Sequence, residues 1–285
     1  MKILVASDLT ARSDRALARG FMLARELKGE LRVVHVVQAD LPEEFREHAT
    51  EWARSALQRE TERLGEETGI KAAIDVFAGH PRSDIARLAA TDAADLLVLG
   101  VHDQCAPGSK TFQETTAGNV LRSSLAPALL VRDEADMPYQ RVVIGVDFSM
   151  FSRAAIRQAL QIAPAADIHL VHAYHVPFQG FLGSESFREQ FAYGQRLELD
   201  AFLKEEMEAV ERRARELGCV PGSLQTTIQE GEPREVLRSS CKRVEADLLV
   251  IATHGRAGLS RVVWGSVAAD LFNDPPCDVL VIRPF

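Results

Sequence analysis

After Met1 the chain reads Lys2-Ile3-Leu4-Val5-Ala6-Ser7-Asp8, and the same pattern returns as Arg141-Val142-Val143-Ile144-Gly145-Val146-Asp147. Each is an apolar run that ends in an aspartate, as expected of a buried strand followed by a turn. Two further apolar runs recur in the same order. They are Ala94-Asp95-Leu96-Leu97-Val98-Leu99-Gly100 with Ala246-Asp247-Leu248-Leu249-Val250-Ile251-Ala252, and Ala128-Leu129-Leu130-Val131-Arg132 with Val279-Leu280-Val281-Ile282-Arg283. Three matched runs in one order indicate an internal repeat.

Apolar residues at helical spacing separate these runs, and Ser13 and Ser152 stand where helix N-caps are expected. Strands that read as continuous apolar runs and alternate with helices predict a parallel sheet covered on both faces. We therefore expect an α/β fold with two tandem domains, 1–138 and 139–285, each with a five-stranded parallel sheet and helices on both faces. The acidic stretch from Asp133 to Tyr139 is the expected linker.

Composition and charge narrow the range of possible functions. Hydrophobic residues make up 46% of the chain, charged residues make up 26%, and the formal net charge is -8. This composition is typical of a globular protein, and the negative charge argues against a nucleic-acid partner or an anionic membrane surface. No leader pattern and no membrane-length apolar run is found, so a cytoplasmic location is expected. The four cysteines form no C-x-x-C pair and are expected to be scattered and reduced.

In open parallel sheets, ligands bind beyond the carboxyl ends of the strands. The loop after the fourth strand of the second repeat contains Gly255 and then Gly265-Ser266, which opens a helix. Glycine lets backbone approach a bound group closely, and a helix start supplies free N–H groups. This combination suits phosphate oxygens.

These residues carry a resemblance to the universal stress protein family, whose ATP-binding members have Gly, two residues, Gly, nine residues, then Gly with Ser or Thr. The resemblance implies two Rossmann-like domains of the adenine nucleotide alpha hydrolase-like fold, a regulatory role in stress response, and one ATP site in the second repeat. It also implies that Asp147 contacts the nucleoside and that the backbone of Ala173 meets adenine. The candidate nucleotide-binding residues are Asp147, Ala173, Ala252, His254, Gly255, Gly265, Ser266 and Val267.

Two features qualify this expectation. Ala252 stands where the family motif begins with Gly, and any need for a positive φ there would cost about 1 kcal/mol or more. Asp147 has an alternative role as an Asx-type cap of the next helix. In the first repeat, Asp103 occupies the second glycine position and Glu114 aligns with Gly265, so a triphosphate would be repelled there. The first repeat is therefore expected to be a degenerate site.

Other functions remain open at this point. The aromatic segment from Phe178 to Tyr193 could bind a partner or an apolar ligand, with no nucleotide bound in either repeat. No catalytic residue follows from spacing, so an enzyme would be at most a slow ATP hydrolase. His169, His172 and His175 lie on a predicted strand, whose alternating faces keep them from converging on a metal. The fifth strands of the repeats are expected to pair within the chain, and a homodimer is possible.

Overall fold

The computed structural model describes residues 1–101, 115–174, 185–253 and 266–283. The first repeat contains β1 (Lys2–Ala6), α1 (Ala11–Glu26), β2 (Glu30–Gln38), α2 (Glu43–Thr68), β3 (Ala72–Gly79), α3 (Pro81–Thr91), β4 (Leu96–Gly100), α4 (Thr116–Ser123) and β5 (Ala128–Val131). The second contains β6 (Arg141–Gly145), α5 (Met150–Ile162), β7 (Asp167–Tyr174), α6 (Glu185–Leu217), β8 (Leu224–Glu230), α7 (Pro233–Val244), β9 (Leu248–Ala252), α8 (Ser266–Asn273) and β10 (Asp278–Ile282). Strands and helices alternate as the sequence predicts.

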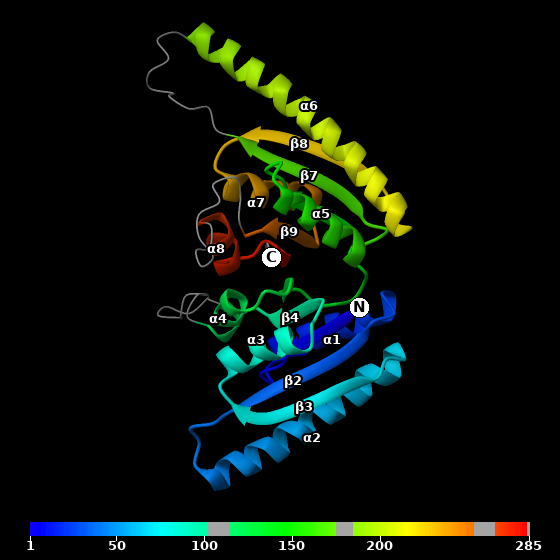
Figure 1. The fold of residues 1–285 in the computed structure, drawn as a ribbon, viewed down its shortest axis with the longest axis vertical. Coiled ribbons are helices and arrows are strands. Elements are labelled where there is room, and N and C mark those ends of the chain that lie inside the picture. The colour runs from blue at the N-terminus through cyan, green and yellow to red at the C-terminus, as the bar shows by residue number, and fades with distance from the viewer. Residues whose placement is uncertain (102–114, 175–184, 254–265, 284–285) are drawn as a thin grey trace.

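The strands form a single ten-stranded sheet in the order β3-β2-β1-β4-β5-β10-β9-β6-β7-β8. Each repeat contributes five parallel strands, and the halves join where β5 and β10 pair antiparallel, with Leu129 opposite Leu280. The repeats follow one another along the long axis of the molecule, as Figure 1 shows. The predicted pairing of the fifth strands within the chain is confirmed, whereas the homodimer stays a prediction.

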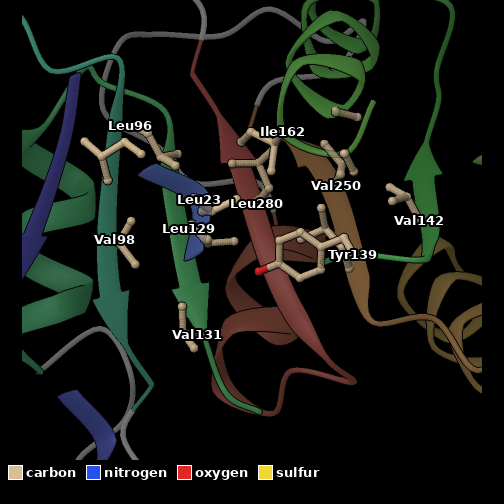
Figure 2. Close-up of a cluster of buried hydrophobic side chains, with 14 of the residues drawn as sticks. Leu23, Leu96, Val98, Leu129, Val131, Tyr139, Val142, Ile162, Val250 and Leu280 are labelled. Atoms are coloured by element: carbon tan, nitrogen blue, oxygen red, sulfur yellow. The ribbon is translucent and has the colours of Figure 1, made fainter. Parts of the chain in front are cut away.

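Buried apolar side chains cover both faces of this sheet. On one face they come from α1, α2, α5 and α6, and on the other from α3, α4, α7 and α8. Each cluster runs through both repeats without a break at the β5–β10 seam. Figure 2 shows the first of these clusters, in which Leu129 and Leu280 lie on adjacent strands beside Tyr139.

The helix after the first strand of each repeat begins three residues earlier than expected. Thr10 and Ser149 are the N-caps, so the prediction of caps at Ser13 and Ser152 is wrong. The reason is a turn residue with φ 62°, Leu9 in one repeat and its counterpart Phe148 in the other. This left-handed residue ends the strand abruptly, and the helix starts at once. The two serines then lie in the first helical turn.

The stretch between the repeats is anchored to the core rather than lying free on the surface. Tyr139, at its end, is only 4% exposed, and its hydroxyl donates to Asp278 Oδ2 at 2.6 Å. The other carboxylate oxygen, Asp278 Oδ1, accepts from the backbone N–H groups of Arg132 and Asp133 at 2.8 and 3.1 Å. Arg19 completes this junction cluster, since its guanidinium lies 4.2 Å from the centre of the Tyr139 ring and 3.4 Å from Asp278 Oδ2.

The arginine after the last strand of each repeat reaches into the other repeat. Arg283 is 8% exposed and donates through Nη1 to the carbonyl oxygens of Leu121, Arg122 and Ser124, at the end of α4. Its counterpart Arg132 is exposed and donates to the Pro276 carbonyl at 2.7 Å. The seam between β5 and β10 is thus stabilised by backbone pairing, by apolar packing, and by two arginines that each donate hydrogen bonds to the other repeat. No helix among the described residues is both long and apolar enough to cross a membrane.

Candidate functional site

The candidate site of the second repeat lies where β6, β7 and β9 end. These three strands run parallel, so their carboxyl ends meet at one edge of the half-sheet. Three of the predicted residues, Asp147, Ala173 and Ala252, stand at or next to these ends. The structure therefore brings them to the same edge of the half-sheet.

The turn after β6 places the carboxylate of Asp147. Its Oδ1 accepts a hydrogen bond from the backbone N–H of Ser149 at 3.0 Å, which is an Asx turn at the start of α5. Asp8 forms the same turn in the first repeat with the N–H of Thr10, at 3.1 Å. The structural role that the sequence left open for Asp147 is thus present in both repeats, and it fixes the carboxylate at the start of α5.

The backbone of Ala173 has a special position in the sheet. The β6–β7 ladder ends at Gly145 and Val171, with the Val146 N–H donating to the Val171 carbonyl at 2.9 Å. In a parallel strand, alternate residues direct their N–H and C=O to the same neighbour. Ala173 therefore directs both groups toward the β6 side, one step beyond the last pair. Its register partner on β8 is Gln229, but that ladder uses the residues on either side of Ala173.

Aromatic side chains pack together beside the turn that contains Asp147. Phe148 packs against His172 with ring centroids 4.6 Å apart, and against Phe202 of α6 at 5.5 Å. His172 is fixed by a contact of 2.7 Å between its Nδ1 and the Val146 carbonyl oxygen. The first repeat keeps the histidine contact, through His35 and the Ser7 carbonyl at 2.8 Å, but has Leu9 in place of Phe148. Sequence reasoning missed Phe148, and the Leu-to-Phe difference after the matched aspartates could have indicated it.

Ala252 ends β9 in an extended conformation. It pairs with Ile282 of β10, and its φ is not among the positive values found in the described part of the chain. The strain considered for an alanine here therefore does not arise. In the first repeat, a Cβ on Gly100 would lie 2.8 Å from the Arg12 carbonyl oxygen. That glycine is required by the close approach of the α1 start, rather than by a positive φ.

The phosphate side of the predicted site is described only from α8 onward. Ser266 is the first residue of α8, and Val267 packs against the buried cluster. Two ion pairs link α7 to this part of the chain, Arg234 with Asp270 of α8 and Arg238 with Asp274 just after it, each at 2.7 Å. His254, Gly255 and Gly265 lie outside the described residues, as do Asp103 and Glu114 of the first repeat. Residues 178–184 of the aromatic segment lie outside them too, and of residues 185–193 only the helical backbone of α6 is described.

The strand histidines have separate partners. His169 Nε2 lies 2.7 Å from Thr227 Oγ1, and burial together with nearby Arg243 lowers the pKa of His169. His172 contacts the Val146 carbonyl instead, and His175 lies outside the described residues. Within the described ranges, no group of three or more His, Cys, Asp or Glu residues could hold a metal ion.

The fold defines a tandem α/β protein whose candidate site residues lie at the carboxyl ends of the strands of its second half. The model of the universal stress protein family matches residues 1–132 and 138–283. The chain belongs to the universal stress protein family. This confirms the resemblance that the repeated motif indicated.

Individual relatives agree with this assignment. Universal stress protein E of Salmonella typhi is 24% identical over 243 residues, covering 81% of this chain and 74% of the relative. A universal stress protein of Methanocaldococcus jannaschii is 31% identical over 149 residues, covering 51% of this chain and 82% of the relative. The crystal structure of a universal stress protein from Archaeoglobus fulgidus superimposes with a TM-score of 0.72 at 18% identity, covering 99% of this chain and 98% of that one. This last likeness shows that the whole tandem fold is shared.

Proposed function

We propose that the second repeat, residues 139–285, is a domain that binds one ATP molecule, and that the first repeat, residues 1–138, is a degenerate copy that binds none. In this proposal the chain acts as a nucleotide-dependent regulator in stress response and not as an efficient enzyme. The observation that carries it is the backbone of Ala173, whose N–H and C=O are directed to the β6 side one step beyond the last β6–β7 pair, next to the turn that contains Asp147.

The backbone N–H and C=O of Ala173 offer one donor and one acceptor, which suit the edge of an adenine ring. Adenine offers a ring nitrogen that accepts and an amino group that donates, and these match the N–H and C=O of a single residue. Backbone recognition explains why alanine can stand at this position without loss of the contact. Phe148 and His172 supply an apolar surface against which the nucleoside can pack.

The phosphate groups would then extend toward the start of α8. The N–H groups at the start of this helix and the Ser266 hydroxyl are donors of the kind that phosphate oxygens require. His254, Gly255 and Gly265 would complete this part by the family motif, and the extended Ala252 does not oppose it. The corresponding part of the first repeat has Asp103 and Glu114, whose carboxylates repel phosphate.

Ala173→Pro tests the backbone contact directly. Proline removes one N–H, and at Ala173 that N–H belongs to neither ladder of β7. We expect ATP to bind the wild type at one site per chain in calorimetric titration, and to bind the variant roughly tenfold more weakly, as the loss of one hydrogen bond implies. The matched control is Val36→Pro, the same change at the corresponding position of β2, which should leave ATP affinity unchanged.

A second variant tests the phosphate side and the number of sites. Gly265→Glu introduces the carboxylate that the first repeat carries, and should abolish binding, whereas Glu114→Gln should leave a stoichiometry of one. Acid extraction of the purified wild type shows whether nucleotide is already bound. The proposal is wrong if neither extraction nor titration detects an adenine nucleotide in a folded wild-type protein, as judged by circular dichroism.

A further inference from the structure

The face of α6 that packs on the sheet carries a charged residue. Among the described side chains of this helix, the buried ones are Leu203, Glu206, Val210 and Ala214. Residues at this spacing lie on one side of a helix, and the three apolar ones belong to the buried cluster on that side of the sheet. Glu206 is only 3% exposed. Removing an ionised carboxylate from water is costly, so the fold must supply it with a partner.

The partner of Glu206 is an arginine that reaches it from solvent. Arg153 lies in the first turn of α5, its side chain is 65% exposed, and its Nε donates to Glu206 Oε1 at 2.9 Å. Its Nη2 lies 2.8 Å from the same oxygen. The other oxygen, Oε2, is buried and has no hydrogen-bond partner among the described residues. This ion pair therefore links the start of α5 to the middle of α6.

A second contact joins the same two segments next to the ion pair. Phe148, in the turn before α5, packs against Phe202 of α6 with ring centroids 5.5 Å apart. Phe202 lies one helical turn before Glu206. Phe148 also packs against His172, so it contacts β7 as well as α6. The placement of α6 thus determines whether Phe148 has an aromatic neighbour on this helix.

The first repeat has neither contact. Aligned through the aspartates that follow the first strands, Leu9 corresponds to Phe148 and Asp14 corresponds to Arg153. Leucine has no ring, and aspartate carries the charge opposite to that of arginine, so neither this ring contact nor this ion pair can form there. A repeat therefore folds without them. Both occur in the repeat to which the nucleotide is assigned above.

We propose that Arg153 and Glu206 are positioning residues of the nucleotide site, because their ion pair clamps α6 to the start of α5 and keeps Phe202 against Phe148. This inference rests on the proposed function, in which the nucleoside packs against Phe148. Neither charged group contacts the ligand, and both act through the aromatic contact. Since coupling between two events is reciprocal, a nucleotide that packs on Phe148 also stabilises the docked position of α6. Docking of α6 is thus the conformational signal of the bound state.

A double-mutant cycle on the full chain tests whether the clamp acts through Phe202. ATP affinity is measured by calorimetry for the wild type, Arg153→Ala, Phe202→Ala and the double variant. We expect each single variant to bind ATP roughly fivefold more weakly, and the double variant to bind no more weakly than Phe202→Ala alone. General damage to the fold would instead make the two effects add. Arg153→Lys keeps the charge and should restore most of the affinity.

Hydrogen exchange of α6, followed by mass spectrometry, detects the clamp without any nucleotide. We expect the amides of residues 194–210 to exchange roughly fivefold faster in Arg153→Ala and in Glu206→Gln, and ATP to slow this exchange in the wild type. Glu206→Gln leaves no buried charge unpaired, so it should keep the fold. The matched control is Arg213→Ala, which removes an ion pair within α6, Arg213 with Glu216 at 2.8 Å, and should change neither exchange nor affinity.

The outcomes separate this inference from the proposed function. If the folded wild type binds no ATP, the proposed function is wrong and the inference falls with it. If the wild type binds ATP and Arg153→Ala binds it equally well, the nucleotide site stands and the clamp is refuted. The clamp is also refuted if the two effects add in the cycle, or if ATP leaves the exchange of α6 unchanged in the wild type.

Discussion

Replacing Asp278 with alanine is expected to lower the free energy of unfolding by about 3–5 kcal/mol, the range for breaking a buried ion pair from one side. The carboxylate is 0% exposed and serves Tyr139, Arg19 and two backbone N–H groups at once. Burial raises the pKa of Asp278, while the Tyr139 hydroxyl and Arg19 counter this effect. Its removal leaves the nearly buried Arg19 guanidinium without its counter-charge, and Arg19 Nε already lacks a hydrogen-bond partner within the described chain.

Urea unfolding, followed by circular dichroism, measures this change, with Asp274→Ala as the control. Asp274 also accepts from an arginine, Arg238 at 2.7 Å, but its side chain is 80% exposed. Exposed pairs contribute roughly 0–1 kcal/mol, so the control should change the unfolding midpoint little. Equal effects of the two substitutions would contradict the role assigned to the junction cluster.

Replacing Arg283 with alanine should cost roughly 2–4 kcal/mol, because it leaves three carbonyl oxygens at the end of α4 without their donor. Burial lowers the pKa of the Arg283 guanidinium, and the three carbonyl oxygens accept hydrogen bonds from it in place of water. Since α4 belongs to the first repeat and Arg283 to the second, the loss weakens the seam as well as the helix.

The repeat itself supplies the control for this prediction. Arg132→Ala removes the corresponding side chain, which is exposed and donates to a single carbonyl, that of Pro276. Its effect should stay below about 1 kcal/mol in the same urea experiment. If Arg132→Ala proves as destabilising as Arg283→Ala, then burial is not what distinguishes the two arginines.

The architecture followed from the sequence because its signals are local and were present twice. The apolar runs that became β1 and β6, or β4 and β9, need no partner to be read as buried strands. Within each repeat a helix separates one strand from the next, and this order implies that the strands pair parallel. Even the β5–β10 seam was predictable, because unpaired inner edges would otherwise lie exposed.

The details that sequence reasoning missed depend on contacts between distant segments. Tyr139 reads as part of a polar linker, and only the fold shows that it reaches Asp278 at the start of β10. The prediction of the N-cap positions was wrong for a different reason, because the left-handed conformation of Leu9 and Phe148 has no clear sequence signature.

The residues of the candidate site also divide into those that the sequence predicted and those that it did not. Asp147 and Ala173 were placed by matching strands, and in the structure both lie near the carboxyl ends of β6 and β7, while their role in binding stays a prediction. The strain expected at Ala252 assumed a positive φ at this position of the motif. In the first repeat, Gly100 is required instead because a Cβ there would clash with the Arg12 carbonyl oxygen. Phe148 was overlooked because a motif of glycines and serines carries no information on the aromatic side chains near it.

The antiparallel seam between β5 and β10 also changes how assembly depends on the amount of protein. Two separate chains with one repeat each would form such a seam by collision, and dilution would separate them. Here residues 132–140 tether the two edges, so their meeting is a first-order event at a high effective concentration. The central part of the sheet therefore stays closed at any expression level, and among the described strands β3 and β8 are the ones at the outer edges of the sheet.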